Sequence, residues 1–168
     1  MGGSSSKVVF DTMTFAPAKR PCGGGAPQGI VTEMLQDVDH VGIAVPDLEA
    51  AVERYRKTFG IEPSHRETIE DQGVEEVMFA VGTSYIQLLG ALSPSTPVGR
   101  FLRRRGGGIH HVAYRVHDLA VALERLKEQG VPLVDAEPRR GSRGTTVAFV
   151  HPKGFGGVLV ELVQEPSD

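Results

Sequence analysis

The chain has little of three things: cysteine, long apolar runs and excess charge of one sign. Its single thiol, Cys22, cannot form an internal disulfide, which excludes a disulfide-stapled secreted scaffold and favours a reducing compartment. No apolar run approaches the ~18 residues that span a bilayer, so we expect no membrane association. With 18 basic against 21 acidic side chains in 168 residues, the charge gives no reason to expect a nucleic-acid partner. We therefore expect a cytoplasmic protein.

Glycine and proline are plentiful instead, at 21 and 11 residues, which is too many turn formers for a helix bundle. Part of the glycine lies in residues 1–36, where neither helical nor strand periodicity persists. Such a segment buries too little apolar surface to offset the entropy of ordering. We predict that residues 1–36 form a disordered or loosely attached extension and that residues 37–168 form the folded domain. The extension has no apolar core of the length that a secretory signal needs.

The rest of the chain contains one pattern twice. The two copies are VDHVGIAVPDLEAAVERY at 38–55 and IHHVAYRVHDLAVALERL at 109–126, and they align at a constant offset of 71 residues. His40 thus matches His111. Agreement of this kind indicates an internal duplication, with module one at 37–99 and module two at 107–165.

Each copy has the same order of predicted elements. A run of strand formers comes first, an aspartate (Asp47 or Asp118) follows at the N-cap of an amphipathic helix, and a glycine (Gly60 or Gly130) ends that helix. Further strand-like segments follow at 64–69, 75–81, 84–89, 132–137, 145–151 and 158–163. The fold class is therefore α+β, with two tandem βαβββ modules that form a curved mixed sheet around a cleft. We interpret residues 106–108, three glycines, as a hinge between the modules.

Four polar side chains interrupt apolar strands at positions that the repeat relates. His40 and His111 lie in the first strand of each copy, and Gln87 and Glu161 lie in the last. A polar residue between aliphatic neighbours is costly to bury without a partner. Any one of them alone is more typical of a hydrogen-bonded core residue, but one rule that places all four favours a shared cleft. Two imidazoles, an amide oxygen and a carboxylate suit one divalent ion, such as Co, Mn, Ni, Zn or Mg.

The remaining candidates are weaker. We interpret His110, His117 and His65 as structural or surface residues and Cys22 as an incidental thiol. His151, in a His-Pro-Lys-Gly segment, is a candidate for lining the site.

Longer motifs extend the pattern. They are DHVGIAV at 39–45, QGVEEV at 72–77, YIQLL at 85–89, GIHHVA at 108–113, EPRRG at 137–141, VHPK at 150–153 and VLVEL at 158–162. Together they resemble the vicinal oxygen chelate superfamily, whose members pair βαβββ modules around a metal ion. Within it, the chain most resembles the methylmalonyl-CoA epimerase family, over roughly residues 36–165.

This resemblance implies roles for particular residues. The metal ligands of the family fall on His40, Gln87, His111 and Glu161. One divalent ion is implied, with Co²⁺ expected and Mn, Ni, Zn or Mg as alternatives. Strand alternation lets only one of Glu75 and Glu76 face the cleft, and the match to the family motif places the additional catalytic glutamate on Glu76. The expected partners are methylmalonyl-CoA and a second copy of the chain in a homodimer.

The implied reaction is epimerisation of (2R)- and (2S)-methylmalonyl-CoA. A metal ion stabilises the enolate that forms when the proton leaves C2. Two carboxylates, Glu76 and Glu161, are expected to act as acid and base on opposite faces of that carbon. Glu161 would then both bind the metal ion and carry a proton, and the sequence does not decide between these two roles.

Basic side chains near the cleft are candidates for contacts with the phosphates of CoA or the substrate carboxylate. They are Arg139, Arg140, Arg143, His151 and Lys153. A place on the solvated surface is an equally good interpretation of each one.

Two other functions stay open within the same superfamily. One is a glyoxalase I-like lactoylglutathione lyase with a similar metal site, against which Glu76 speaks. The other is a non-catalytic ligand-binding protein, although the complete set of four ligands favours an enzyme. An extradiol dioxygenase fits less well, because Gln87 is a poor match to an iron site of two histidines and one carboxylate.

Overall fold

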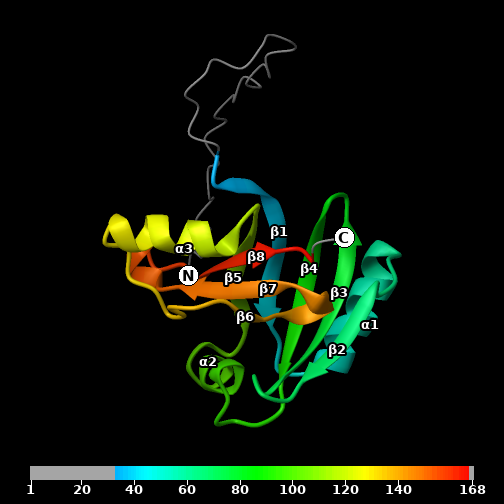
Figure 1. The fold of residues 1–168 in the computed structure, drawn as a ribbon. Coiled ribbons are helices and arrows are strands. Elements are labelled where there is room, and N and C mark those ends of the chain that lie inside the picture. The colour runs from blue at the N-terminus through cyan, green and yellow to red at the C-terminus, as the bar shows by residue number, and fades with distance from the viewer. Residues whose placement is uncertain (1–32, 167–168) are drawn as a thin grey trace, which may run out of the picture. The chain divides into compact units, whose positions relative to one another are not determined.

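The computed structural model describes residues 33–166, which contain the two repeated modules and a helix between them (Figure 1). Module one consists of β1 (Leu35–Ala44), α1 (Leu48–Phe59), β2 (His65–Ile69), β3 (Val74–Val81) and β4 (Ser84–Ala91). Helix α2 (Pro97–Arg105) follows. Module two consists of β5 (Gly108–Val116), α3 (Leu119–Glu128), β6 (Arg139–Arg140), β7 (Thr146–Val150) and β8 (Val160–Gln164). No helix in this part of the chain is long and apolar enough to cross a membrane.

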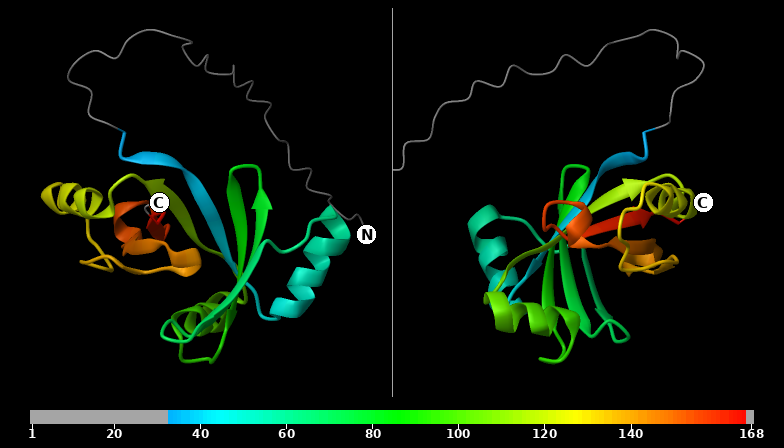
Figure 2. Two further views of the ribbon diagram at one scale, coloured as in Figure 1. Left: turned by 45° about the vertical axis from the view of Figure 1, so that its right-hand side comes forward. Right: turned by 90° about the vertical axis from the view of Figure 1, so that its left-hand side faces the viewer.

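All eight strands belong to one mixed sheet, in the order β2-β3-β4-β1-β5-β8-β7-β6. The two modules meet where β1 pairs with β5 antiparallel, and each of these central strands pairs with the last strand of its own module in parallel. The two halves of the sheet curve, with α1 and α3 on the outside (Figure 2). The predicted α+β class and the paired βαβββ order are confirmed.

The two repeated helices begin where the sequence predicts. Asp47 Oδ1 accepts a hydrogen bond of 2.9 Å from Ala50 N, and Asp118 Oδ1 accepts one of 3.0 Å from Val121 N. These carboxylates satisfy backbone donors that the first helical turn leaves free. Helix α1 ends at the left-handed Gly60, whereas α3 ends two residues before Gly130.

The two faces of the sheet differ, because helices pack on only one of them in each module. Leu48 and Val52 of α1 pack on Val77, Phe79 and Leu88. The equivalent cluster under α3 contains Leu119, Leu123, Leu126, Ala148, Val150, Val160 and Leu162. Because side chains alternate along a strand, the intervening residues of β3, β4, β7 and β8 face the opposite side of the sheet. That side holds the candidate site.

The strand predicted at 132–137 is wrong. Only Leu133 makes an isolated bridge, to Val150, and the edge strand β6 is two residues long and lies further on. Pro132 and Pro138 lack the N–H that a ladder requires. Asp135 between them turns its carboxylate inward, where Oδ2 accepts from Phe149 N at 2.9 Å.

Helix α2 was not predicted. Its glycine and four arginines suggest a solvated linker, yet Thr96 Oγ1 accepts from Gly99 N at 3.1 Å and Pro97 occupies the first turn. Val98 is buried against Ala44 of β1, and this contact holds the helix against that strand. The glycines that we interpreted as a hinge begin with Gly106, the left-handed C-cap of this helix.

The domain boundary remains a prediction, because residues 1–32 lie outside the described part of the chain. Strand β1 begins at Leu35, so its first two residues fall within the segment that we assigned to the extension.

Candidate active site

Strand register brings the four predicted ligands together at the junction of the modules. Gly42 in β1 lies opposite Gln87 in β4 and His111 in β5. In the same way, Ala113 in β5 lies opposite His40 in β1 and Glu161 in β8. The four side chains therefore rise from four adjacent central strands, and each is at most 7% exposed.

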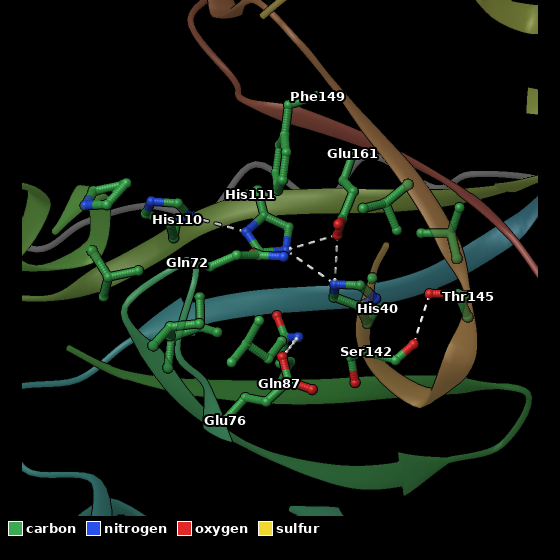
Figure 3. A pocket seen from close by; sticks show the side chains of 18 of the residues that line it. His40, Gln72, Glu76, Gln87, His110, His111, Ser142, Thr145, Phe149 and Glu161 are labelled. Carbon is green, nitrogen blue, oxygen red and sulfur yellow. Dashed lines mark hydrogen bonds and ion pairs between the residues drawn. The ribbon is translucent and has the colours of Figure 1, made fainter. Parts of the chain in front are cut away.

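Three of these side chains each bring one potential ligand atom to the same point (Figure 3). His40 Nε2 lies 3.0 Å from His111 Nε2 and 3.0 Å from Glu161 Oε2, and His111 Nε2 lies 3.2 Å from Glu161 Oε2. Bonds of about 2.1 Å to a divalent ion place neighbouring ligand atoms about 3 Å apart. One divalent ion could therefore be held by all three atoms of this triangle.

Gln87, the fourth predicted ligand, contacts Glu76. Its Nε2 donates a 2.7 Å hydrogen bond to Glu76 Oε2, while its Oε1 is buried and has no hydrogen-bond partner within residues 33–166. A buried carbonyl oxygen without a donor is costly. A cation at the triangle would provide the missing partner. Two imidazoles, a carboxylate and an amide oxygen together suit a divalent ion of the first transition row.

Charge in the cluster is arranged around the same point. Burial disfavours a proton on His40, but Asp39 and Glu161 outweigh burial and raise the His40 pKa to about 9. Burial lowers the pKa of His111. Burial also opposes ionisation of Glu161, yet hydrogen bonds from His111 and His40 lower its pKa. At neutral pH the ion-free cluster thus pairs an ionised Glu161 with a protonated His40, and a divalent ion would replace that proton.

Glu76 faces the cavity and Glu75 does not. Glu76 is 2% exposed, and burial raises its pKa. Glu75, on the opposite side of β3, accepts hydrogen bonds of 2.9 Å and 2.6 Å from Arg66 Nε and Nη2. A buried carboxylate with a raised pKa can accept and return a proton near neutral pH. His65, which we interpreted as structural, lies near Glu76, with ligand atoms within 4.8 Å.

Two residues of the site were missed as functional candidates. Asp39 was quoted only as part of a motif, yet it is fully buried behind His40. His110, interpreted as structural or at the surface, lines the cavity, and its Nδ1 lies 3.0 Å from His111 Nδ1. Burial lowers the pKa of His110 to about 4, so its ring is neutral. The available signal was that each of them directly precedes a ligand histidine in the repeat.

A cavity of about 350 Å³ lies over these residues, with apolar walls from both modules. Its lining includes Arg139 and Arg143 of the predicted basic set. The Arg139 guanidinium lies over the Phe149 ring at 5.1 Å, and its Nε donates to Asp135 Oδ2 at 3.0 Å. Arg143 Nη2 donates to Asp39 Oδ1 at 2.8 Å.

The other three members of the basic set are not among the lining residues. Arg140 is exposed, and its carbonyl accepts a hydrogen bond of 3.4 Å from Gln72 Nε2. His151 Nδ1 accepts from Lys153 N at 3.1 Å, which caps a single turn of 3-10 helix. The structure therefore brings two of the five basic candidates to the cavity.

Comparison with known proteins identifies the family. The model of the Glyoxalase/Bleomycin resistance protein/Dioxygenase superfamily matches residues 39–149. The chain belongs to this superfamily. The predicted membership of the vicinal oxygen chelate group, another name for this superfamily, is confirmed.

Several similar proteins are epimerases by name. The ethylmalonyl-CoA/methylmalonyl-CoA epimerase of Cereibacter sphaeroides is 43% identical over 133 residues, which cover 78% of this chain and 99% of that protein. The crystal structure of methylmalonyl-CoA epimerase from Mycobacterium tuberculosis matches with a TM-score of 0.78 and 42% identity, covering 83% of this chain and 95% of the other. A methylmalonyl-CoA epimerase in complex with methylmalonyl-CoA and NH4+ matches at 0.77 and 42%, covering 79% and 96%.

Proposed function

We propose that the chain is a metal-dependent epimerase that interconverts (2R)- and (2S)-methylmalonyl-CoA. One observation carries the proposal: a buried carboxylate, Glu76, hydrogen-bonded to Gln87, lines the same cavity as a triangle of metal-ligand atoms. The similarity to epimerases over about four-fifths of the chain supports it.

The chemistry requires a proton to leave and return at C2, which lies between a thioester and a carboxylate. A divalent ion held by His40, Gln87, His111 and Glu161 would supply stabilisation of the negative charge that develops on the substrate oxygens. Co²⁺ is the ion we propose, with Mn, Ni, Zn and Mg as alternatives.

Glu76 is proposed to move the proton on one face of C2. Its burial disfavours the charged form, so the carboxylate gains from accepting a proton. The hydrogen bond from Gln87 Nε2 fixes the Oε2 atom of Glu76.

Glu161 is proposed as the carboxylate of the opposite face as well as a ligand. It comes from β8 of module two, whereas Glu76 comes from β3 of module one. Both histidines hold the Glu161 carboxylate and lower its pKa in the ion-free protein, which favours the ligand role over the proton-carrying role.

Substrate anions are proposed to bind at the basic residues around the cavity. Arg139 lines it and, within residues 33–166, forms an ion pair with Asp135 alone, so it is the first candidate for the substrate carboxylate. Arg140, His151 and Lys153 lie outside the lining and are candidates for the phosphates of CoA. Arg143 lines the cavity, and Asp39 holds its guanidinium. Arg143 is a further candidate for the phosphates of CoA. We also propose a cytoplasmic homodimer.

The proposal is tested with the full chain loaded with Co²⁺ and a single epimer of methylmalonyl-CoA in deuterated water. Deuterium should enter at C2 as the other epimer appears, whereas lactoylglutathione should remain unchanged. Absence of exchange with Co²⁺ demonstrably bound would overturn the epimerase assignment, and turnover of lactoylglutathione would favour the lyase.

A further inference from the structure

The two ligand histidines are equivalent in the repeat, but the side chains behind their rings differ. Asp39 precedes His40, and His110 precedes His111, so the two preceding residues are also 71 positions apart. A metal-binding histidine usually donates its second N–H to a fixed acceptor, which sets the tautomer and the ring orientation. The duplication has therefore placed a carboxylate behind one ligand and an imidazole behind the other.

Asp39 holds the first ring firmly. His40 Nδ1 lies 2.7 Å from Asp39 Oδ1, and the carboxylate can only accept, so the Nδ1 proton points at Asp39. In the neutral ring this places the lone pair of His40 on Nε2, the atom that faces His111 and Glu161. Asp39 is completely buried, so water does not compete for the contact.

Two arginines of module two hold Asp39 in turn. Arg115 donates to Asp39 Oδ2 from Nη2 at 3.0 Å and from Nε at 3.3 Å, and Arg143 Nη2 donates to Oδ1 at 2.8 Å. Arg143 has a left-handed backbone with φ of 56° and lies over the Tyr85 ring at 4.6 Å. A residue with a side chain adopts this conformation only where its surroundings impose it. The carboxylate is thus fixed at both oxygens from across the module junction.

His110 holds the second ring more loosely. Its Nδ1 lies 3.0 Å from His111 Nδ1, so one nitrogen donates and the other accepts. For His111 to present a lone pair on Nε2 while neutral, its Nδ1 must carry the proton and His110 must accept it. A neutral imidazole supplies this hydrogen bond without the charge of a carboxylate. The only ring beside His110, apart from His111, within residues 33–166 is Phe101, at 5.0 Å.

We propose that Asp39, fixed by Arg115 and Arg143, is the positioning residue that orients His40 for metal binding, and that His110 has the corresponding, weaker role for His111. The inference rests on the proposed metal site but not on the reaction. Since both arginines come from module two and Asp39 from module one, the clamp also couples the metal site to correct docking of the modules.

The test uses ion-free full-length protein and Co²⁺ as the probe. Asp39→Asn keeps the shape of the side chain and removes its charge, and Asp47→Asn is the matched control because asparagine caps a helix as well as aspartate. Affinity is compared for all variants at one fixed pH. Asp39→Asn should weaken Co²⁺ binding by about 10–100-fold and shift the visible absorption bands of bound Co²⁺, whereas Asp47→Asn should change neither. His110→Asn should weaken binding by a smaller factor.

Wild-type affinity and spectrum in Asp39→Asn would overturn the inference, as would a larger loss in His110→Asn than in Asp39→Asn. If Asp39→Asn does not fold, the double variant Arg115→Gln/Arg143→Gln keeps the carboxylate and releases it. It should lose Co²⁺ affinity and show the same spectral shift, and unchanged binding there would overturn the clamp. Failure of the wild type to bind Co²⁺ would instead contradict the proposed metal site itself. The experiment therefore distinguishes failure of the metal site from failure of the positioning role of Asp39.

Discussion

Replacing Gly42 by alanine tests whether His111 is held where the structure places it. A Cβ atom on Gly42 would lie 2.3 Å from His111 Cε1 and 2.7 Å from both ring nitrogens. Ordinary carbon contacts lie near 3.5–4.0 Å, so the ring would have to retreat by about 1 Å. The φ of Gly42 is not among the positive values, so alanine adds no backbone strain and the effect is steric alone.

The displacement is large compared with the tolerance of a metal site. His111 Nε2 is 3.0 Å from His40 Nε2 and 3.2 Å from Glu161 Oε2, and ligand distances in a working site hold to within about 0.2 Å. We therefore expect Gly42→Ala to weaken Co²⁺ binding by on the order of tenfold or more. Overpacking of the buried ring should also lower the free energy of unfolding by about 1–3 kcal/mol.

Calorimetric Co²⁺ titration and urea unfolding measure the two effects. Gly90→Ala is the matched control, since its Cβ would meet the side chain of Leu48 at 3.1 Å on the helix-covered face. That variant should lose some stability and keep its Co²⁺ affinity. Wild-type affinity in Gly42→Ala would refute the claim that the position of the His111 ring defines the site.

Three further predictions follow from the cluster and the caps. Co²⁺ affinity should rise about tenfold per pH unit up to the His40 pKa of about 9, and binding at pH 7 should release about one proton. Calorimetric titrations in buffers of different ionisation enthalpy measure the number of protons released. An affinity that does not change with pH would contradict the prediction. The folded-state pKa of His40 is raised above 6.5, so its contribution to ion-free stability is complete below pH 6.5 and is lost as the pH rises through 9. Urea unfolding of the wild type should therefore show a free energy of unfolding that loses this contribution between pH 6.5 and 9. The same pH dependence in His40→Gln would count against the prediction. Asp118→Ala should lower the free energy of unfolding by about 1 kcal/mol while Asp118→Asn retains it, and equal loss in both would show that the cap is not the cause.

The repeat is what made the site predictable. His40 and His111 were related by their offset, and β1 and β5 do pair antiparallel at the module junction. Gln87 and Glu161 follow because each last strand pairs in parallel with the first strand of its module. Strand alternation showed that only one of Glu75 and Glu76 could face the cleft, and the resemblance to the epimerase family selected Glu76. The four ligands needed only periodicity and symmetry, which a sequence displays directly.

The rest depended on contacts that symmetry does not relate. Asp39 and His110 are equivalent in position but unlike in chemistry, so the repeat marked their places before the ligand histidines without indicating their roles. The arginines on Asp39 come from β5 and from a loop with a left-handed residue, Arg143. Helix α2 lies outside the repeat altogether, and its arginine-rich last turn conceals the buried Val98.

The central claim is that Glu76 carries the C2 proton beside a metal ion. Co²⁺-loaded wild type, Glu76→Gln and Glu75→Gln are each mixed with a single epimer of methylmalonyl-CoA in deuterated water, and deuterium at C2 is followed by NMR. Glu75 is the matched control, because it is adjacent in the chain but paired with Arg66 on the opposite face. We predict exchange by wild type and Glu75→Gln, and a rate lower by about 10²-fold or more in Glu76→Gln with Co²⁺ still bound. Exchange by Glu76→Gln at the wild-type rate would contradict the account.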